Sequence, residues 1–352
     1  MVSIILPCRN ERESIEHSVK EALETLHKNG FEGEVIVSDS SQDGSAEIAR
    51  AAGAKVIRHN REGYGLAVKE GLKEAKGDII VLADGDATYD LEKLPDMIRE
   101  LDGSDIVIGS RLKGHIEKGA MPFLHKRFGT PFINLLLFLI FGIKTSDSQS
   151  GFRAFKSRTI KELDSEIKSS AFTYNTEMFI KAKRMGLKIK EIPVNYRARK
   201  GSSKLKTYRD GTDNAKYIFM LSPFCLYLVP GVLLILLGIT DLFFESLVPG
   251  LLNRATVKIL FPLLGIQIVF LGLFAKTYAY TKLGEKIDFI RRIYQERKLR
   301  LFLLLGILLV VIPAILKVMG LAGMHFDILL VSALAGLQII FNTIILSTLS
   351  IK

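Results

Sequence analysis

The chain has 352 residues, enough for two domains, and its 48 Lys and Arg against 37 Asp and Glu give a formal net charge of +11. Because many of the basic residues flank apolar segments, we attribute this charge to contact with anionic lipid headgroups and expect no nucleic-acid partner. The two cysteines, Cys8 and Cys225, lie in unlike segments, so we expect neither a disulfide nor a Cys-x-x-Cys metal site.

Strands and helices alternate through the first part of the chain. Apolar runs bounded by turn residues predict strands at 2–7, 33–38, 55–58, 78–83 and 105–108, and helices at 14–26, 45–52 and 66–75. This order is typical of an α/β domain with a mostly parallel sheet and helices on both faces. Such sheets bind ligands at the carboxyl ends of their strands.

Polar residues follow three of these predicted strands. Asn10 and Glu11 follow the first strand, Asp39 follows the second, and Asp84 and Asp86 follow the fourth. Caps and turns explain one such cluster, but three acidic clusters at three strand ends exceed what caps require. Two carboxylates at a strand end can hold Mg²⁺ or Mn²⁺ and leave positions for phosphate oxygens, whereas without a cation they repel each other. We therefore predict a divalent-cation site at Asp84 and Asp86.

Three later segments are rich in glycine or in basic residues. Segment 63–71, GYGLAVKEG, precedes a predicted helix but matches neither a Walker A loop nor a dinucleotide fingerprint. Segment 147–155, DSQSGFRAF, is predicted to be a loop. Segment 197–205, RARKGSSKL, is either a solvated charge run or a phosphate-binding loop, and its place just before a membrane segment favours the second interpretation.

One apolar run in the first half is too short to cross a bilayer. It covers 132–143 and follows His125, Lys126 and Arg127. A buried core helix and a helix lying in the membrane interface both fit this pattern.

The second half of the chain is dominated by apolar residues. Segments 223–244, 257–280, 301–319 and 328–349 each approach the roughly 20 apolar residues that a membrane span needs. The loop between the second and third segments is rich in basic residues, so the positive-inside rule predicts that it is cytoplasmic. With four spans, the first domain and the C-terminal Lys352 then lie on the same side. No secretory signal precedes the first strand, which agrees with that orientation. We expect a multi-pass membrane protein with a cytoplasmic domain at 1–206, an interfacial segment at 207–222 and four spans within 223–352.

Seven segments of the first 206 residues together resemble a known family. They are IILPCRNERESI, IVSDSSQDGS, GYGLAVKEGLKEAKGD, DGD, IGSR, DSQSGFRAF and RKGSSK. In this order they resemble the family 2 glycosyltransferases of the GT-A fold, in the branch of polyprenyl-phosphate sugar synthases that includes dolichyl-phosphate mannose synthase. The resemblance implies an enzyme that transfers a hexose, with inversion, from a GDP- or UDP-sugar to polyprenyl or dolichyl phosphate and that uses Mg²⁺ or Mn²⁺.

The resemblance also implies roles for individual residues. It assigns the nucleotide sugar to Pro7, Asn10, Glu11, Asp39, Gly65, Asp84 and Gly85. It assigns catalysis to Asp86, Asp147, Arg111 and Arg199. It assigns the lipid phosphate to Arg153, Ser203 and Lys204, and the cation to Asp84 and Asp86. A phosphate monoester is largely dianionic at neutral pH, so we expect Asp147 to position an arginine or the sugar rather than accept a proton.

Two departures from the family pattern leave the base and the sugar open. Ser38 and Asp39 stand where many relatives have paired aspartates, and DGDATYDLEKLP stands where mannose synthases often read DADLQHPP. A processive polysaccharide synthase is a weaker alternative, because such enzymes carry a Q-x-x-R-W motif and this chain has no tryptophan. Another membrane glycosyltransferase, for example one that makes a glycolipid, and a catalytically inactive membrane scaffold are further alternatives.

Overall fold

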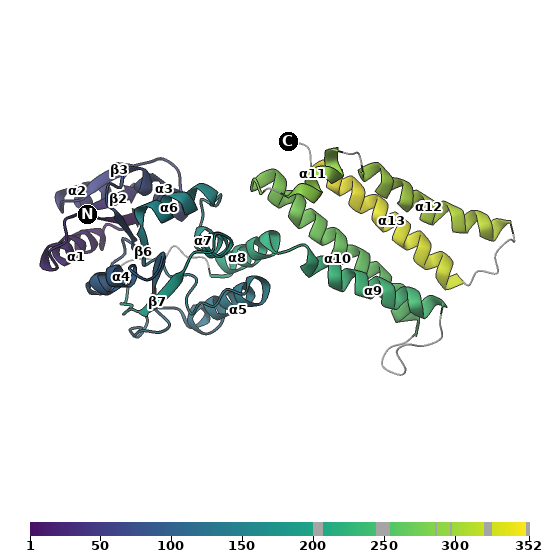
Figure 1. The fold of residues 1–352 in the computed structure, drawn as a ribbon, viewed down its shortest axis with the longest axis horizontal. Helices are drawn as coiled ribbons and strands as arrows, with labels where there is room; N and C mark the ends of the chain where they lie inside the picture. The colour runs from purple at the N-terminus through teal and green to yellow at the C-terminus, as the bar shows by residue number, and fades with distance from the viewer. Residues whose placement is uncertain (200–206, 244–253, 286, 296–297, 320–325, 350–352) are drawn as a thin grey trace. The chain divides into compact units, whose positions relative to one another are not determined.

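A computed structural model describes residues 1–199, 207–243, 254–285, 287–295, 298–319 and 326–349 (Figure 1). The chain divides into two compact units, Met1–Ile218 and Phe219–Lys352. The predicted residues Ser203 and Lys204 lie outside the described residues.

The first unit is built on a seven-stranded sheet. The strands are β1 (Val2–Cys8), β2 (Gly33–Asp39), β3 (Lys55–Arg58), β4 (Ile79–Leu82), β5 (Ile106–Ser110), β6 (Arg153–Lys156) and β7 (Ile189–Pro193). Their order is β3-β2-β1-β4-β6-β5-β7, and β6 alone among them runs antiparallel to its neighbours β4 and β5. This confirms the predicted α/β fold with a mostly parallel sheet.

Helices cover both faces of the sheet (Figure 1). Helices α1 (Ile15–Lys28), α2 (Ser45–Ala51) and α4 (Leu94–Glu100), the last preceded by the short 3₁₀ turn η1 (Leu91–Lys93), pack on one face. Helices α3 (Tyr64–Glu74), α6 (Ser157–Glu166) and α7 (Tyr174–Arg184) lie on the other. The alternation of β1 explains both layers, because Ile4 and Leu6 join the core under α1 while Ile5 packs against α3 at Gly71.

The apolar run at 132–143 forms helix α5 (Thr130–Phe141), which continues from a π-helical turn η2 (His125–Gly129). Within α5, Ile133 and Leu137 are buried, but Phe132 and Leu139 are 52% and 67% exposed. A buried core helix is therefore wrong. The structure shows a helix with one buried stripe and a broad exposed apolar face.

From Thr207 onward, the residues that the structure describes are mainly helical. The helices are α8 (Thr207–Leu221), α9 (Cys225–Phe243), α10 (Arg254–Lys282), α11 (Asp288–Gln295), α12 (Leu299–Val318) and α13 (Phe326–Leu349). Helix α10 packs against both α9 and α13, and α13 also packs against α12. Gln267 on α10 accepts hydrogen bonds from Gln338 and Asn342 on α13, at 2.7 and 3.2 Å, which joins two apolar helices by polar contacts.

These helices fit a membrane protein. Among the described residues, Val257–Lys282, Leu299–Val318 and Ile328–Leu349 are long and apolar enough to cross a bilayer, and a fourth span results if the bent pair Gly211–Leu221 and Cys225–Asp241 is counted as one. Three of the four predicted spans thus coincide with such helices.

Candidate active site

The sheet topology gathers the predicted polar clusters at one edge. Strands β1, β2, β4 and β5 are mutually parallel, and β6 runs the opposite way. The carboxyl ends of these four parallel strands therefore lie at the same edge of the sheet as the amino end of β6. This edge receives Glu11 after β1, Asp39 at the end of β2, Asp84 and Asp86 after β4, and Arg111 after β5.

The acidic pair lies just beyond β4. Asp86 is 6% exposed, and its Oδ1 accepts hydrogen bonds from the backbone N–H and the hydroxyl of Thr88, at 3.2 and 2.6 Å. Asp84 lies against the backbone of Gly151, where an added Cβ would fall 2.6 Å from Oδ1, so a side chain at 151 would displace the carboxylate. Burial and the Asp86 carboxylate raise the pKa of Asp84 to about 7, against the opposing effect of Arg111 and Arg199.

Arg199 bridges two of the clusters. Its NH1 lies 3.2 Å from Asp86 Oδ2, and its NH2 donates to Glu11 Oε1. Its buried Nε has no hydrogen-bond partner among the described residues. Two residues earlier, Arg197 pairs with Glu21 and Asp90. The chain after β7 is thus tied by two arginines to the carboxylates that follow β1 and β4.

Arg111 and Asp147 form a buried ion pair at the same edge. Asp147 is fully buried, and its two oxygens accept from Nε and NH2 of Arg111 at 2.7 and 2.8 Å. Burial alone would lower the pKa of Arg111, but the Asp147 carboxylate outweighs it and holds that pKa well above its ordinary value. Both oxygens of Asp147 are occupied, which agrees with its expected positioning role. That role is still a prediction.

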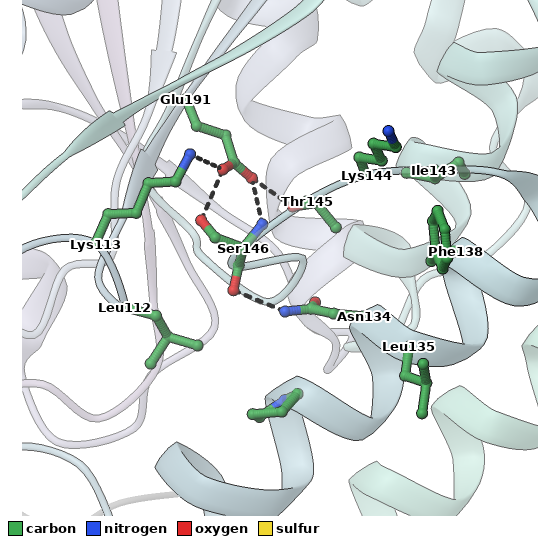
Figure 2. Close-up of a pocket in the computed structure, with 11 residues that line it drawn as sticks. Leu112, Lys113, Asn134, Leu135, Phe138, Ile143, Lys144, Thr145, Ser146 and Glu191 are labelled. Atoms are coloured by element: carbon green, nitrogen blue, oxygen red, sulfur yellow. Dashed lines mark hydrogen bonds and ion pairs between the residues drawn. The ribbon is translucent and has the colours of Figure 1, made fainter.

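A pocket of about 570 Å³ adjoins this pair. Leu112 and Ser146, the immediate chain neighbours of Arg111 and Asp147, help to line it, and Leu135 and Phe138 of α5 form its apolar side (Figure 2). At its polar end Glu191 accepts from Lys113 at 2.8 Å and from the Ser146 backbone and hydroxyl at 2.8 and 2.6 Å. The pocket is therefore amphipathic, with charged groups near the active edge.

Several residues that are predicted to bind the nucleotide sugar lie on β1 and β2 or just after β1. The register pairs Pro7 with Ser38 and Cys8 with Asp39. Asn10 adopts a left-handed backbone (φ 54°), and its Oδ1 accepts from the Gln42 backbone at 2.9 Å. Asp39 is fully buried and its Oδ2 has no hydrogen-bond partner among the described residues, although Arg58 Nε lies 3.7 Å away.

Two glycines of the predicted set have packing roles. Gly85 is buried, with its carbonyl accepting from the Ser14 hydroxyl at 3.3 Å. Gly65, in the first turn of α3, lies against Ser169 and Tyr174. An added Cβ would fall 2.8 Å from the Ser169 carbonyl oxygen at Gly65 and 3.1 Å from the Pro7 carbonyl oxygen at Gly85. Gly65 therefore needs a small residue and Gly85 is tightly packed, while contact of either with a nucleotide sugar stays a prediction.

Arg153 requires a correction. The sequence places it in a loop at the lipid phosphate, but it is the first residue of β6 and is fully buried. Its Nε and NH2 donate to the carbonyl oxygens of Ser150 and Ser148, both at 2.8 Å, and its guanidinium lies 5.1 Å from the Phe179 ring centre. Arg153 therefore shapes the 147–151 loop from behind and has no exposed surface for a lipid phosphate.

Sequence reasoning missed two tyrosines at this edge. The Tyr89 hydroxyl accepts from the Gly151 backbone at 2.7 Å, and the Arg111 guanidinium lies 5.2 Å from the Tyr196 ring centre. The two rings contact each other edge to face. Their closeness in sequence to Asp86 and Arg197 was the one available signal.

The donor set at Asp84 and Asp86 fits a divalent cation that is shared with a substrate. Among the described residues, no three His, Cys, Asp or Glu side chains converge as a complete cation site. Two carboxylates are nevertheless what Mg²⁺ commonly uses when phosphate oxygens and water complete its coordination. Burial first, and then the Asp86 carboxylate, keep the pKa of Asp84 raised although Arg111 and Arg199 lower it, so the charged form of Asp84 would gain from a cation.

Known proteins are similar to this chain in sequence and in fold. The family model described as glycosyl transferase family 2 matches residues 3–164. The low-salt glycan biosynthesis hexosyltransferase Agl6 of Haloferax volcanii is 34% identical over 68% of this chain and 58% of its own length. The dolichyl-phosphate hexose transferase of the same organism is 34% identical over 53% of this chain and 79% of its length, and an uncharacterized protein of Methanocaldococcus jannaschii is 35% identical over 55% and 80%.

Two solved structures have the same fold. Mannosyl-3-phosphoglycerate synthase from Rubrobacter xylanophilus covers 62% of this chain and 72% of its own, with a TM-score of 0.51 and 20% identity. Glucosyl-3-phosphoglycerate synthase from Mycobacterium tuberculosis covers 62% and 79%, with a TM-score of 0.50 and 23% identity. With relatives at least 34% identical over about four-fifths of their length, and with these acidic and basic clusters at one edge of the sheet, the chain belongs to the family 2 glycosyltransferases and has their GT-A fold.

Proposed function

We propose that this glycosyltransferase moves a hexose, with inversion, from a UDP- or GDP-sugar to a polyprenyl or dolichyl phosphate. The observation that carries the proposal is the meeting of the Asp84 and Asp86 carboxylates with Arg111 and Arg199 at one sheet edge, in a chain that also has apolar helices of membrane-spanning length. The relative named dolichyl-phosphate hexose transferase supports the lipid-phosphate acceptor.

The reaction we propose is a single displacement. An oxygen of the lipid phosphate forms a bond to the anomeric carbon, and the bond from that carbon to the diphosphate breaks. Because the phosphate monoester has a second pKa of about 6, the attacking oxygen carries no proton at neutral pH and needs no general base. The nucleoside diphosphate leaves with the electron pair, and the anomeric centre inverts.

The acidic and the basic residues at this edge of the sheet would have different roles in the reaction. Asp84 and Asp86 would hold Mg²⁺ or Mn²⁺, which supplies stabilisation for the charge that develops on the leaving diphosphate. Arg111, fixed by Asp147, holds a permanent positive charge at the site, and the structure gives its NH1 no hydrogen bond among the described residues. Arg199 adds a second positive charge. Together they would offset the repulsion between two phosphate-bearing substrates.

The acceptor would approach from the side of α5. The amphipathic pocket beside Arg111 offers Leu135 and Phe138 to the first isoprene units and places charged groups near the phosphate end. The exposed apolar face of α5, with Lys126 and Arg127 in the preceding turn η2, would lie at the headgroup level of the membrane. We further propose four spans, a cytoplasmic catalytic domain and an interfacial segment at 207–222.

One experiment tests the function and names the sugar. Purified full-length protein would be offered radiolabelled UDP-glucose, UDP-galactose, UDP-N-acetylglucosamine and GDP-mannose with dolichyl phosphate and Mg²⁺ or Mn²⁺. We expect lipid-linked product from one donor, and its loss when EDTA removes the cation. No lipid-linked product from any donor would refute the proposal.

A further inference from the structure

Two buried polar atoms near the acidic pair have no hydrogen-bond partner among the described residues. They are the hydroxyl oxygen of Tyr64, the first residue of α3, and Oδ1 of Asn175, the second residue of α7. The Asn175 side chain lies near enough to the Tyr64 hydroxyl to lower its pKa, but no hydrogen bond of ordinary geometry joins these two atoms. Asn175 is only 5% exposed. Native proteins satisfy the great majority of such atoms, so an unsatisfied pair calls for a missing partner, either a water or a ligand.

The surrounding structure holds the Tyr64 ring in place. Its ring stacks on Phe172 at 5.8 Å and meets Tyr174 edge to face at 6.3 Å. The 168–173 loop that carries Phe172 is pinned by the fully buried Glu177, whose oxygens accept from the backbone of Lys168 and Ser169 at 3.0 and 2.8 Å.

Backbone contact between this loop and α3 is equally close. The Ser170 carbonyl accepts from the Leu66 backbone at 3.0 Å, and a Cβ at Gly63 would fall 2.3 Å from that carbonyl oxygen. Gly63 also has φ 142°, which other residues rarely adopt. These contacts fix the place of the Tyr64 ring, and with it the place of its hydroxyl next to the Asn175 side chain.

A chain of contacts connects Asn175 to the acidic pair. The hydroxyl of the next residue, Thr176, accepts from Gln149 Nε2 at 3.0 Å. Gln149 belongs to the 147–151 loop, and Gly151 at the end of this loop lies directly against the Asp84 carboxylate. The charge of Asp84 also contributes, after burial, to raising the pKa of Tyr64. Tyr64 thus lies within electrostatic reach of Asp84, and Asn175 is connected to Asp84 through its neighbour Thr176 and the 147–151 loop.

We propose that Tyr64 and Asn175 are sugar-specificity residues, whose hydroxyl and amide oxygen hydrogen-bond hydroxyl groups of the donor's hexose. This inference rests on the proposed nucleotide-sugar donor. If a cation at Asp84 and Asp86 binds the diphosphate, the hexose is one bond away from that diphosphate. Two neutral polar groups suit a neutral sugar, whereas the phosphates have Arg111 and Arg199. A site built to hydrogen-bond a hydroxyl also discriminates well against sugars that lack it or point it elsewhere.

Equilibrium binding to the full-length protein tests this assignment without an acceptor. Calorimetry in Mg²⁺ would compare UDP-glucose, UDP-galactose, UDP-N-acetylglucosamine and GDP-mannose with free UDP and GDP. For the sugar that the wild type binds best, Asn175→Ala and Tyr64→Phe should each weaken binding roughly tenfold, while binding of the free nucleoside diphosphate changes less than about twofold. The difference in affinity between UDP-glucose and UDP-galactose should also become smaller in both variants.

Tyr174→Phe is the matched control. Its hydroxyl belongs to the same aromatic cluster but donates to Asp164 at 2.8 Å, so its loss should leave donor binding unchanged. Thermal melting of each variant reports folding, and Tyr64→Phe, which removes one oxygen, keeps the test valid if Asn175→Ala does not fold.

Three results would overturn the inference. The first is an equal loss of affinity for the nucleotide sugar and for the free diphosphate. The second is no loss of affinity in either variant, which would mean that a buried water, or a hydrogen bond between the two side chains, satisfies both atoms. The third is a wild type that binds no sugar donor more tightly than its diphosphate. A wild type that binds donors in this way but forms no lipid-linked product would instead refute the proposed acceptor.

Discussion

Asp147 accepts three hydrogen bonds from Arg111: two from the guanidinium, at 2.7 and 2.8 Å, and one from the backbone N–H at 3.0 Å. The carboxylate is fully buried and the arginine side chain is 10% exposed. Such a pair stabilises a fold weakly as a unit, but removal of one partner leaves a buried charge unpaired. Asp147 therefore fixes the position of the positively charged Arg111 guanidinium at the active edge.

Asp147→Asn should destabilise the first unit strongly. The amide keeps the shape of the carboxylate but cannot neutralise Arg111, and loss of one partner of a buried pair costs about 3–5 kcal/mol. We expect a lower free energy of unfolding in denaturant titrations and a clearly lower melting temperature. Glu162→Gln, which breaks the exposed pair with Arg158 on α6, is the control and should melt like the wild type. Equal melting of the Asp147 variant and the wild type would contradict the burial of an unpaired charge.

Asp86→Asn should reduce turnover without unfolding the protein. The amide oxygen can still accept from the backbone and hydroxyl of Thr88, so the loop after β4 keeps its conformation. The lost charge weakens the cation site that stabilises the leaving diphosphate, and we expect transfer to slow by roughly 10²–10³-fold. The measurement is the initial rate of lipid-linked product at saturating donor. Asp96→Asn on the exposed surface of α4 serves as the control, and a fully active Asp86 variant would rule out the metal role.

Much of this architecture could be predicted from the sequence, because local patterns determine it. The strand before Asn10, the strand that ends at Asp39 and the strand before Asp84 each contain an apolar run of three or four residues, and parallel pairing then brings their carboxyl ends to one edge. The acidic pair was predicted from its place after such a strand. None of these steps needs knowledge of distant contacts.

Other features depend on tertiary contacts that no local pattern contains. Strand β6 has four residues, RAFK, and its antiparallel place between β4 and β5 follows from pairing with strands about 50 to 75 residues away. The buried Arg153 side chain donates hydrogen bonds to the carbonyl oxygens of Ser148 and Ser150. The composition of this segment is typical of a loop and does not indicate these contacts. Strand β7 is a short edge strand that ends in Pro193, and its alternation is too brief to identify alone.

Arg199→Ala should have opposite effects on cation binding and on turnover. The guanidinium lies 3.2 Å from Asp86 Oδ2 and also contacts Glu11, so it would compete with a divalent cation for the same carboxylate. Its removal should tighten Mn²⁺ binding by roughly tenfold in the absence of donor. Turnover should fall, because a positive charge opposite the leaving group is lost.

Electron paramagnetic resonance of free Mn²⁺ gives the affinity directly. Arg197→Ala is the matched control, since it removes an arginine two residues away that pairs with Glu21 and Asp90 instead. We expect this control to bind Mn²⁺ like the wild type. Unchanged affinity in the Arg199 variant would mean that Asp86 is not a ligand of the cation.

Cys8 should be nearly inert toward thiol reagents in the folded protein. Burial, with the Asp39 carboxylate as the next cause, raises the pKa of its thiol from 9.0 to about 12. At pH 8 about one thiol in 10⁴ is then ionised, against about one in ten when unfolded, so alkylation should slow by about 10³-fold. Iodoacetamide labelling of a Cys225→Ser background, with and without guanidinium chloride, isolates Cys8. The raised pKa also predicts a pH dependence of stability. Between pH 9.0 and about 12 the thiol ionises in the unfolded protein but not in the folded protein, so the free energy of unfolding should fall by about 1.4 kcal/mol per pH unit. Cys8→Ala, added to Cys225→Ser, should remove this part of the pH dependence. Rapid labelling of the folded protein would contradict the burial of Cys8 at the end of β1.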